Sequence, residues 1–147
     1  MGQIYFKGFF MIKKVYVLIL IAMFSSCSSH VNYVPTDALN YKQAADTVIE
    51  LTAMQDLKFR PSYATLTDEF IAYNYDNTRV KVSRRTGRIY FKYIKALELQ
   101  KYGNWYNVHI LNDKNESFAE IYHSQDIGDT QLFMNAFNSL RKKSVQL

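Results

Sequence analysis

The chain has 147 residues and a formal net charge of +5 at pH 7, and it is 48% hydrophobic, 16% aromatic and 21% charged. This length favours one domain, and the composition is that of a globular protein and excludes a disordered chain. The single cysteine excludes a disulfide framework and a cysteine-rich zinc site.

The first 26 residues have the pattern of a secretory signal peptide. Lys13 and Lys14 precede an uncharged apolar run over residues 15–24, which small polar residues and Cys27 follow. The run is about half of the roughly 20 residues that a membrane-spanning helix needs. We therefore expect residues 1–26 to be removed. Residues 1–10 precede Met11, at which a more usual signal would begin, and we give them no structural weight.

Phe24-Ser25-Ser26-Cys27 at the end of the apolar run resembles the lipobox of bacterial lipoproteins. In that family the cysteine becomes the first mature residue and carries a thioether-linked diacylglycerol, usually with a further amide-linked acyl chain. The resemblance implies that Ser26 precedes the cut and that Cys27 is lipidated, although Phe24 stands where the family usually has leucine. Two or three acyl chains hold a protein firmly on a membrane, because each buried CH₂ contributes about 0.8 kcal/mol. The alternative is an ordinary signal peptide and a buried free cysteine.

The resemblance implies a membrane-anchored protein of the bacterial cell envelope. A run of acidic residues after the cysteine would resemble the surface-export signal of some bacterial groups; no such run follows Cys27, so we expect the protein to face the periplasm. Residues 1–26 carry three lysines and no acid, so the remaining 15 basic and 13 acidic residues give a net charge of +2. The positive total is thus largely a targeting signal and does not indicate a nucleic-acid partner.

The rest of the chain predicts a tether followed by one α+β domain. Residues 27–35 are short and polar and predict the tether, and residues 36–147 predict the domain. Helical spacing of apolar residues predicts a first helix over residues 36–56, capped by Thr36 or Asp37. An apolar stripe predicts a C-terminal amphipathic helix, capped by Asp126 or Asp129.

Between these helices, short β-branched and aromatic runs alternate with turn signals. Short loops favour antiparallel pairing, so we expect about six to seven strands in a bent sheet or partly open barrel. Turns are expected at Asp76–Asn77 and at Arg85-Thr86-Gly87, on either side of a strand through Val80 and Val82. The remaining expected strands cover residues 70–75, 89–93, 96–102, 105–111 and 117–123.

Such a sheet with one C-terminal amphipathic helix resembles the pleckstrin-homology-like superfold, which includes bacterial PH-like and GRAM-like domains. The segment over residues 88–99 resembles one of its internal hairpins, with a strand, an apolar pair at Ile94 and Leu97 and a return strand. The resemblance covers residues 62–143 and implies a fold without implying an activity. The main alternative is a helix-first cone that resembles the nuclear-transport-factor-2-like fold.

A basic concentration is the most suggestive binding signal. Eight lysines and arginines lie within residues 79–101, with Glu98 as the only acid. Arg84, Arg85 and Arg88 flank one expected turn, and guanidinium groups suit phosphate because they offer a bidentate fork. In many PH-like domains a basic hairpin meets a lipid phosphate, so the resemblance implies an anionic headgroup as the ligand. The alternative is a solvated face that protects a sheet edge.

Trp105 and Tyr106 follow Gly103-Asn104 at an expected turn, where an exposed tryptophan would indicate contact with a partner or a membrane. His30, His109 and His123 show no metal-ligand spacing, and no nucleophile motif or phosphate-cradling glycine loop is present. We expect no catalytic residues, no metal, no cofactor and no nucleic-acid partner.

The sequence therefore predicts a non-enzymatic, lipid-anchored binding or interaction module near the membrane. Its partners would be the membrane itself, through the acyl chains, and anionic headgroups or another envelope protein. The alternative is a carrier or sensor of a small apolar ligand held between sheet and helix, which needs a cavity lined by side chains such as Tyr106, Val108 and Phe137.

Overall fold

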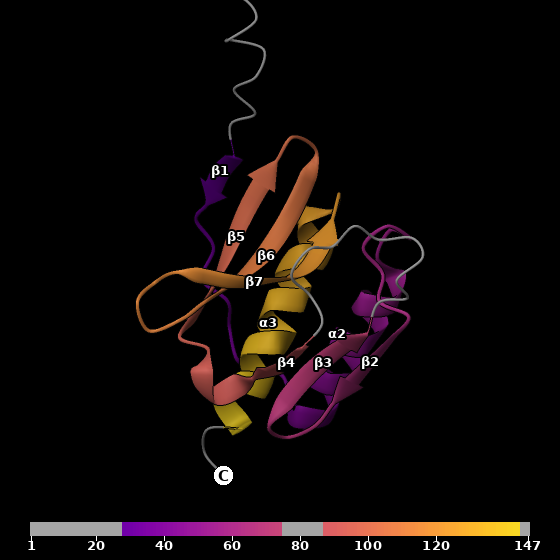
Figure 1. Cartoon of the computed structure of the whole chain (residues 1–147), viewed down its shortest axis with the longest axis vertical. Coiled ribbons are helices and arrows are strands. Elements are labelled where there is room, and N and C mark those ends of the chain that lie inside the picture. Colours follow the sequence, from indigo (N-terminus) through magenta and orange to yellow (C-terminus); the bar gives the residue numbers. More distant parts are fainter. Residues whose placement is uncertain (1–27, 75–86, 145–147) are drawn as a thin grey trace, which may run out of the picture.

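The computed structural model describes residues 28–74 and 87–144. Within these ranges the chain is α+β, with two α-helices and seven strands in two antiparallel sheets (Figure 1). The predicted class and C-terminal helix are confirmed. The expected single bent sheet or partly open barrel is replaced by two separate sheets that do not close into a barrel.

The larger sheet has four strands in the order β1-β5-β6-β7. It consists of β1 (Ser28–Val31), β5 (Ala96–Tyr102), β6 (Trp105–Leu111) and β7 (Ser117–Ser124). The bounds predicted for β5 and β6 are confirmed. The turn between them is tight because Gly103 adopts a left-handed conformation with φ +57°, which an L side chain rarely adopts.

Strand β1 corrects the expectation that residues 28–35 are all tether. It pairs antiparallel with β5, from Ser28 opposite Tyr102 to Val31 opposite Leu99. In addition, His30 Nδ1 lies 2.8 Å from Glu98 Oε1. The first three residues of β1 are exposed and only Val31 packs toward the core, so an edge strand here has the composition of a polar linker.

The smaller sheet has the order β2-β3-β4. It consists of β2 (Tyr63–Leu66), β3 (Phe70–Asn74) and β4 (Gly87–Tyr90). A strand was expected over residues 89–93, but β4 ends at Tyr90 and a 3₁₀ helix, η1 (Phe91–Tyr93), follows. The chain turns there because Phe91 enters the core, where its ring centroid lies 5.6 Å from that of Phe137. The turns and the strand expected over residues 76–86 lie outside the described residues.

Both helices begin at a side-chain cap. α2 (Tyr41–Met54) starts after Asn40, which forms a capping box with Gln43, and this corrects the expected start at Thr36 or Asp37. α3 (Ile127–Ser144) starts after Asp126, whose Oδ1 accepts from the backbone N–H of Gly128 at 2.6 Å and of Asp129 at 3.2 Å. Asp126 was one of the two predicted caps.

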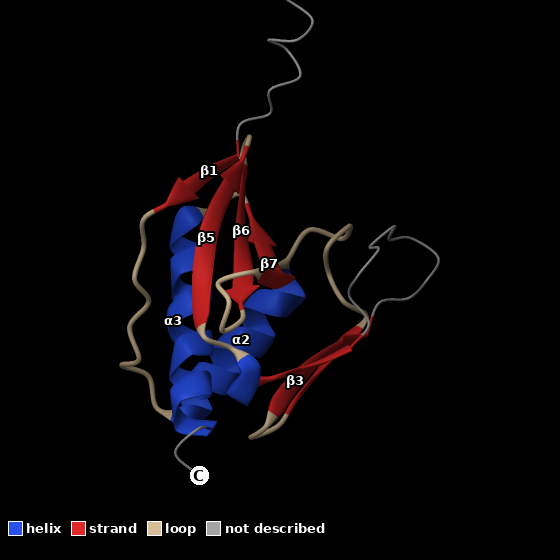
Figure 2. Cartoon of the chain, turned by 60° about the vertical axis from the view of Figure 1, so that its left-hand side comes forward, coloured by secondary structure: helices blue, strands red, loops and turns tan. Residues whose placement is uncertain are grey.

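The helices pack against each other; α3 covers one face of the four-stranded sheet, and α2 contacts β2 of the smaller sheet (Figure 2). Phe133 of α3 stacks on Tyr122 of β7, with ring centroids 4.3 Å apart. Burying such large rings removes much apolar area from water and so stabilises the fold. The largest fully buried side chains of this core include Phe91, Phe133, Phe137, Ile71, Leu99, Ile110, Ile121, Met134 and Leu140.

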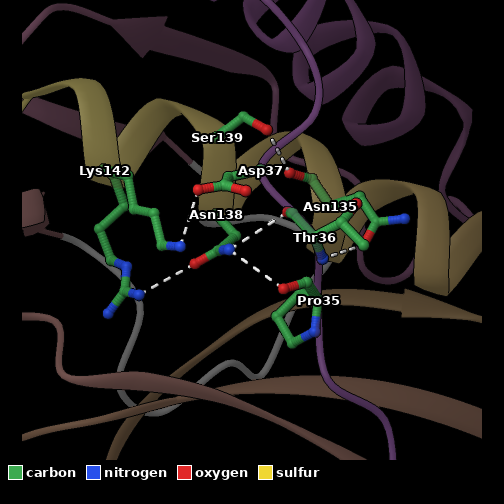
Figure 3. A network of polar contacts seen from close by, with 8 residues as sticks. Pro35, Thr36, Asp37, Asn135, Asn138, Ser139 and Lys142 are labelled. Atoms are coloured by element: carbon green, nitrogen blue, oxygen red, sulfur yellow. Dashed lines mark hydrogen bonds and ion pairs between the residues drawn. The ribbon is translucent and has the colours of Figure 1, made fainter.

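An extended segment, residues 32–40, runs along α3 and is held there by polar side chains of the helix (Figure 3). Asn138 Nδ2 donates to the carbonyls of Pro35 at 3.2 Å and Thr36 at 3.1 Å. Asn135 Oδ1 accepts from the Thr36 N–H at 2.8 Å. Because these bonds fix the backbone of Thr36, the segment before Asn40 stays extended. We call residues 32–40 the strap.

Candidate functional site: an aromatic and cationic sheet face

The outer face of the smaller sheet carries aromatic and cationic side chains. Along β3, Ile71 and Tyr73 are buried, so the alternation of a strand turns Phe70, Ala72 and Asn74 to the other side. Strand pairing then adds residues opposite these three. Tyr63 lies opposite Asn74, Arg88 opposite Ala72 and Tyr90 opposite Phe70. We call the surface formed by Tyr63, Phe70, Arg88 and Tyr90 the outer face.

Cations lie over the rings of this face. The Arg88 guanidinium carbon is 4.9 Å from the Phe70 ring centroid, and the Phe70 and Tyr90 centroids are 5.5 Å apart. From η1, Lys92 Nζ lies 5.0 Å from the Tyr93 ring and 6.0 Å from that of Tyr90. Such stacking holds a cation in place without neutralising its charge.

Arg88 is exposed and forms no salt bridge with any acidic residue of the described ranges. Tyr63 is 60% exposed, although large apolar rings are usually more deeply covered. The edge of the guanidinium therefore remains available for a bidentate contact with an anion, while its plane is held against Phe70.

The outer face is hollowed. A shallow hollow of about 470 Å³ is lined by Tyr63, Phe70, Asn74 and Arg88, among others. Beyond η1, Lys92 and Tyr93 line a second hollow of about 540 Å³ together with Lys95 and Phe118. Tyr93 is 63% exposed and its ring lies 6.2 Å from that of Tyr90, so it connects the outer face to this second hollow.

Of the predicted anion-binding residues, the structure places Arg88 on the outer face. Arg84 and Arg85 lie outside the described residues, as does Cys27. Sequence reasoning missed Phe70 and Tyr63 as parts of the site. The alternation along residues 70–75 was a signal for Phe70, but only the pairing register reveals that Arg88 and Tyr63 share its face.

Trp105 and Tyr106 lie on opposite faces of β6. Tyr106 packs against the core, with Lys101 Nζ 5.4 Å from its ring. Trp105 turns to the other side of β6 and is half-buried. Its ring lies 5.1 Å from that of Phe59, and Lys58 Nζ lies 4.2 Å from its centroid. Trp105 therefore packs against Phe59 and Lys58 of the loop after α2.

The histidines serve local structure. His123 is buried and stacks on Phe59, with the two ring centroids 4.2 Å apart. Its Nδ1 lies 2.9 Å from Asn107 Oδ1. His109 Nδ1 lies 3.0 Å from Ser117 Oγ. Within the described ranges no group of three or more His, Cys, Asp or Glu side chains is arranged to hold a metal ion.

Three further observations bear on function. Val108 and Phe137, expected to line a carrier cavity, are fully buried in the core, and neither borders the two hollows described above. Across residues 28–74 and 87–144, no helix is both long and apolar enough to cross a membrane. Comparisons with protein-family models, curated proteins and solved structures find no match for the chain.

Proposed function

We propose that the protein is a lipid-anchored, non-enzymatic binding module of the bacterial envelope, and that its outer face binds a phosphate or similar anionic group. The observation that carries this proposal is the exposed guanidinium of Arg88, stacked on Phe70 beside the hollow of the outer face. A fixed guanidinium next to aromatic rings suits a ligand that joins a phosphate to a ring or an apolar group.

The anchor rests on the lipobox-like sequence that ends at Cys27. The described domain begins at the next residue, with Ser28 already paired in β1. Lipidation of Cys27 would therefore attach the domain to the envelope membrane without an intervening linker. We place the domain on the periplasm-facing side.

The second candidate function is a carrier of a small apolar ligand. It needs an enclosed space between the four-stranded sheet and α3. Val108 and Phe137 would have to line that space, but both are 0% exposed within one packed cluster. This favours a binding surface over a carrier.

The outer face can be tested with the lipidated protein held in vesicles of phosphatidylcholine. In one arm inorganic pyrophosphate is titrated as a soluble phosphate. In the other, separate vesicles that contain phosphatidylglycerol are offered as a source of lipid headgroups. We expect Arg88→Ala to weaken binding, the triple change at Arg84, Arg85 and Arg88 to abolish it, and added salt to weaken it in the unmodified protein.

Lys114→Ala is the matched control, because it removes one positive charge from the exposed turn between β6 and β7. It should leave binding unchanged. If Arg88→Ala and Lys114→Ala weaken binding equally, binding depends only on the overall charge of the protein, and the proposed site is contradicted. The arm that responds identifies whether the phosphate is soluble or belongs to a lipid.

A further inference from the structure

The start of β1 fixes where a lipid on Cys27 would meet the domain. Ser28 pairs with Tyr102, the last residue of β5, and Tyr102 pairs with Trp105 across the turn. Paired Cα atoms of antiparallel strands are about 5 Å apart, so the described chain begins, at Ser28, within about 5 Å of Tyr102. We call residues 101–105 the hairpin tip.

The hairpin tip has the composition of a protein segment that lies at a membrane–water interface. Its sequence, Lys-Tyr-Gly-Asn-Trp, holds one cation and no acid. Tyr102 is 39% exposed, and Lys58 extends its ammonium group over the Trp105 ring. Tyrosine and tryptophan favour the headgroup level of a bilayer, and lysine is attracted to anionic lipid.

We infer that the domain rests on the bilayer surface through the hairpin tip, with Tyr102 and Trp105 at the level of the lipid headgroups. This inference depends on the proposed lipidation of Cys27 and adds an orientation to it. The surface that the hairpin tip contacts is the bilayer that holds the lipid anchor, because Ser28 is already paired in β1 and leaves no free linker after Cys27.

This orientation has a consequence for the outer face. In both views β1 and the hairpin tip lie at one end of the domain, and the smaller sheet lies toward the other end (Figures 1 and 2). A domain that rests on the hairpin tip therefore holds Arg88 and Phe70 away from the bilayer to which it is anchored. The ligand of the outer face must then come from the aqueous space or from a facing surface.

Trp105 is the only tryptophan of the chain, so its fluorescence reports the tip alone. The lipidated protein is reconstituted in vesicles of phosphatidylethanolamine and phosphatidylglycerol that contain a headgroup spin-labelled lipid. We expect the spin label to remove most of the Trp105 emission. A variant with a long flexible Ser/Gly insert between Cys27 and Ser28, beginning Ser-Ser to keep the residues after the cysteine, should regain that emission.

A second variant moves the reporter. Trp105→Phe combined with Phe118→Trp places the only tryptophan on β7, at an exposed site next to Ser117, which pairs with Leu111 at the far end of β6. This end lies roughly 20 Å along β6 from the tip, and its emission should not be quenched.

The outcomes separate the anchor from the orientation. Protein that floats with the vesicles but shows unquenched Trp105 emission overturns the orientation and leaves the anchor intact. Equal quenching at positions 105 and 118 also overturns it. Protein that does not float with the vesicles overturns the anchor, and the orientation with it.

Discussion

Ser28 lies directly opposite Tyr102, so the first described residue of the domain is paired with the residue at which β5 enters the hairpin turn. Residues 28–31, expected to belong to a tether over residues 27–35, instead form an edge strand of the four-stranded sheet. If Cys27 is lipidated, the domain is fixed close to the membrane and in one orientation. The proposed module therefore differs from a domain that is free to explore the space around its anchor.

The strap should depend on Asn138. Its amide donates to two strap carbonyls and its oxygen accepts from Arg141 Nη2 at 2.9 Å. Asn138 is 3% exposed and its hydrogen bonds are part-buried, so Asn138→Ala removes three bonds that water replaces only in part, and we expect it to lower the free energy of unfolding by about 1–3 kcal/mol. Urea unfolding measures the change.

Lys142→Ala provides the comparison for that variant. Lys142 binds Asp37 of the strap at 2.7 Å on the exposed side of the same helix, and its hydrogen bond and charge lower the pKa of the Asp37 carboxyl. Exposed ion pairs contribute little, so this variant should unfold almost as the unmodified protein does. If both variants behave alike, the strap is not held by Asn138.

Core packing predicts that alanine substitutions at two neighbouring residues of α3 will lower the free energy of unfolding by very different amounts. Phe133 is fully buried against Tyr122, whereas Leu132 is 45% exposed. Phe133→Ala should lower the free energy of unfolding by about 3–5 kcal/mol, because it removes buried area and leaves a cavity. Leu132→Ala should change it much less. Thermal unfolding of both variants checks the prediction, which fails if their midpoints fall equally.

Alkaline pH should destabilise the fold through Tyr122. Burial is the main cause that raises the pKa of its hydroxyl to about 12, against about 10 in an unfolded chain. The neutral form is favoured in the fold, so this stabilisation is fully present below pH 10 and is lost as the pH rises toward 12. The loss is roughly 2–3 kcal/mol at most.

Tyr122→Phe keeps the ring and removes the titrating group. Its unfolding free energy should therefore fall less steeply above about pH 10 than that of the unmodified protein. Part of the slope should remain, because burial also raises the pKa of Tyr41 to about 12, assisted by Asp68. Identical slopes in urea unfolding at a series of alkaline pH values would refute the role of Tyr122.

Local pattern was sufficient for part of the fold. Apolar and polar residues alternate in the sequences of β5 and β6, turns bound both strands, and the apolar stripe on α3 follows a helical period. These elements carry their signal within a few residues. The cap at Asp126 is of the same kind, because its oxygen bonds to N–H groups two and three residues away.

The remaining elements depend on contacts between distant parts of the chain. β1 has a polar sequence and becomes a strand only by pairing with β5, some 70 residues later. The strap stays extended because α3 holds it, so Thr36 caps no helix. For the candidate site, sequence located Arg88 in a basic run, but its position over Phe70 follows from the β3–β4 register.

Lipidation of Cys27 is the proposed attachment that holds this domain on the membrane. It is tested most directly by growing cells with a clickable fatty acid and comparing the unmodified protein with Cys27→Ser. We predict acyl label and membrane recovery for the unmodified protein, and the loss of both in the variant. Acyl label or membrane recovery that persists in Cys27→Ser would contradict the account.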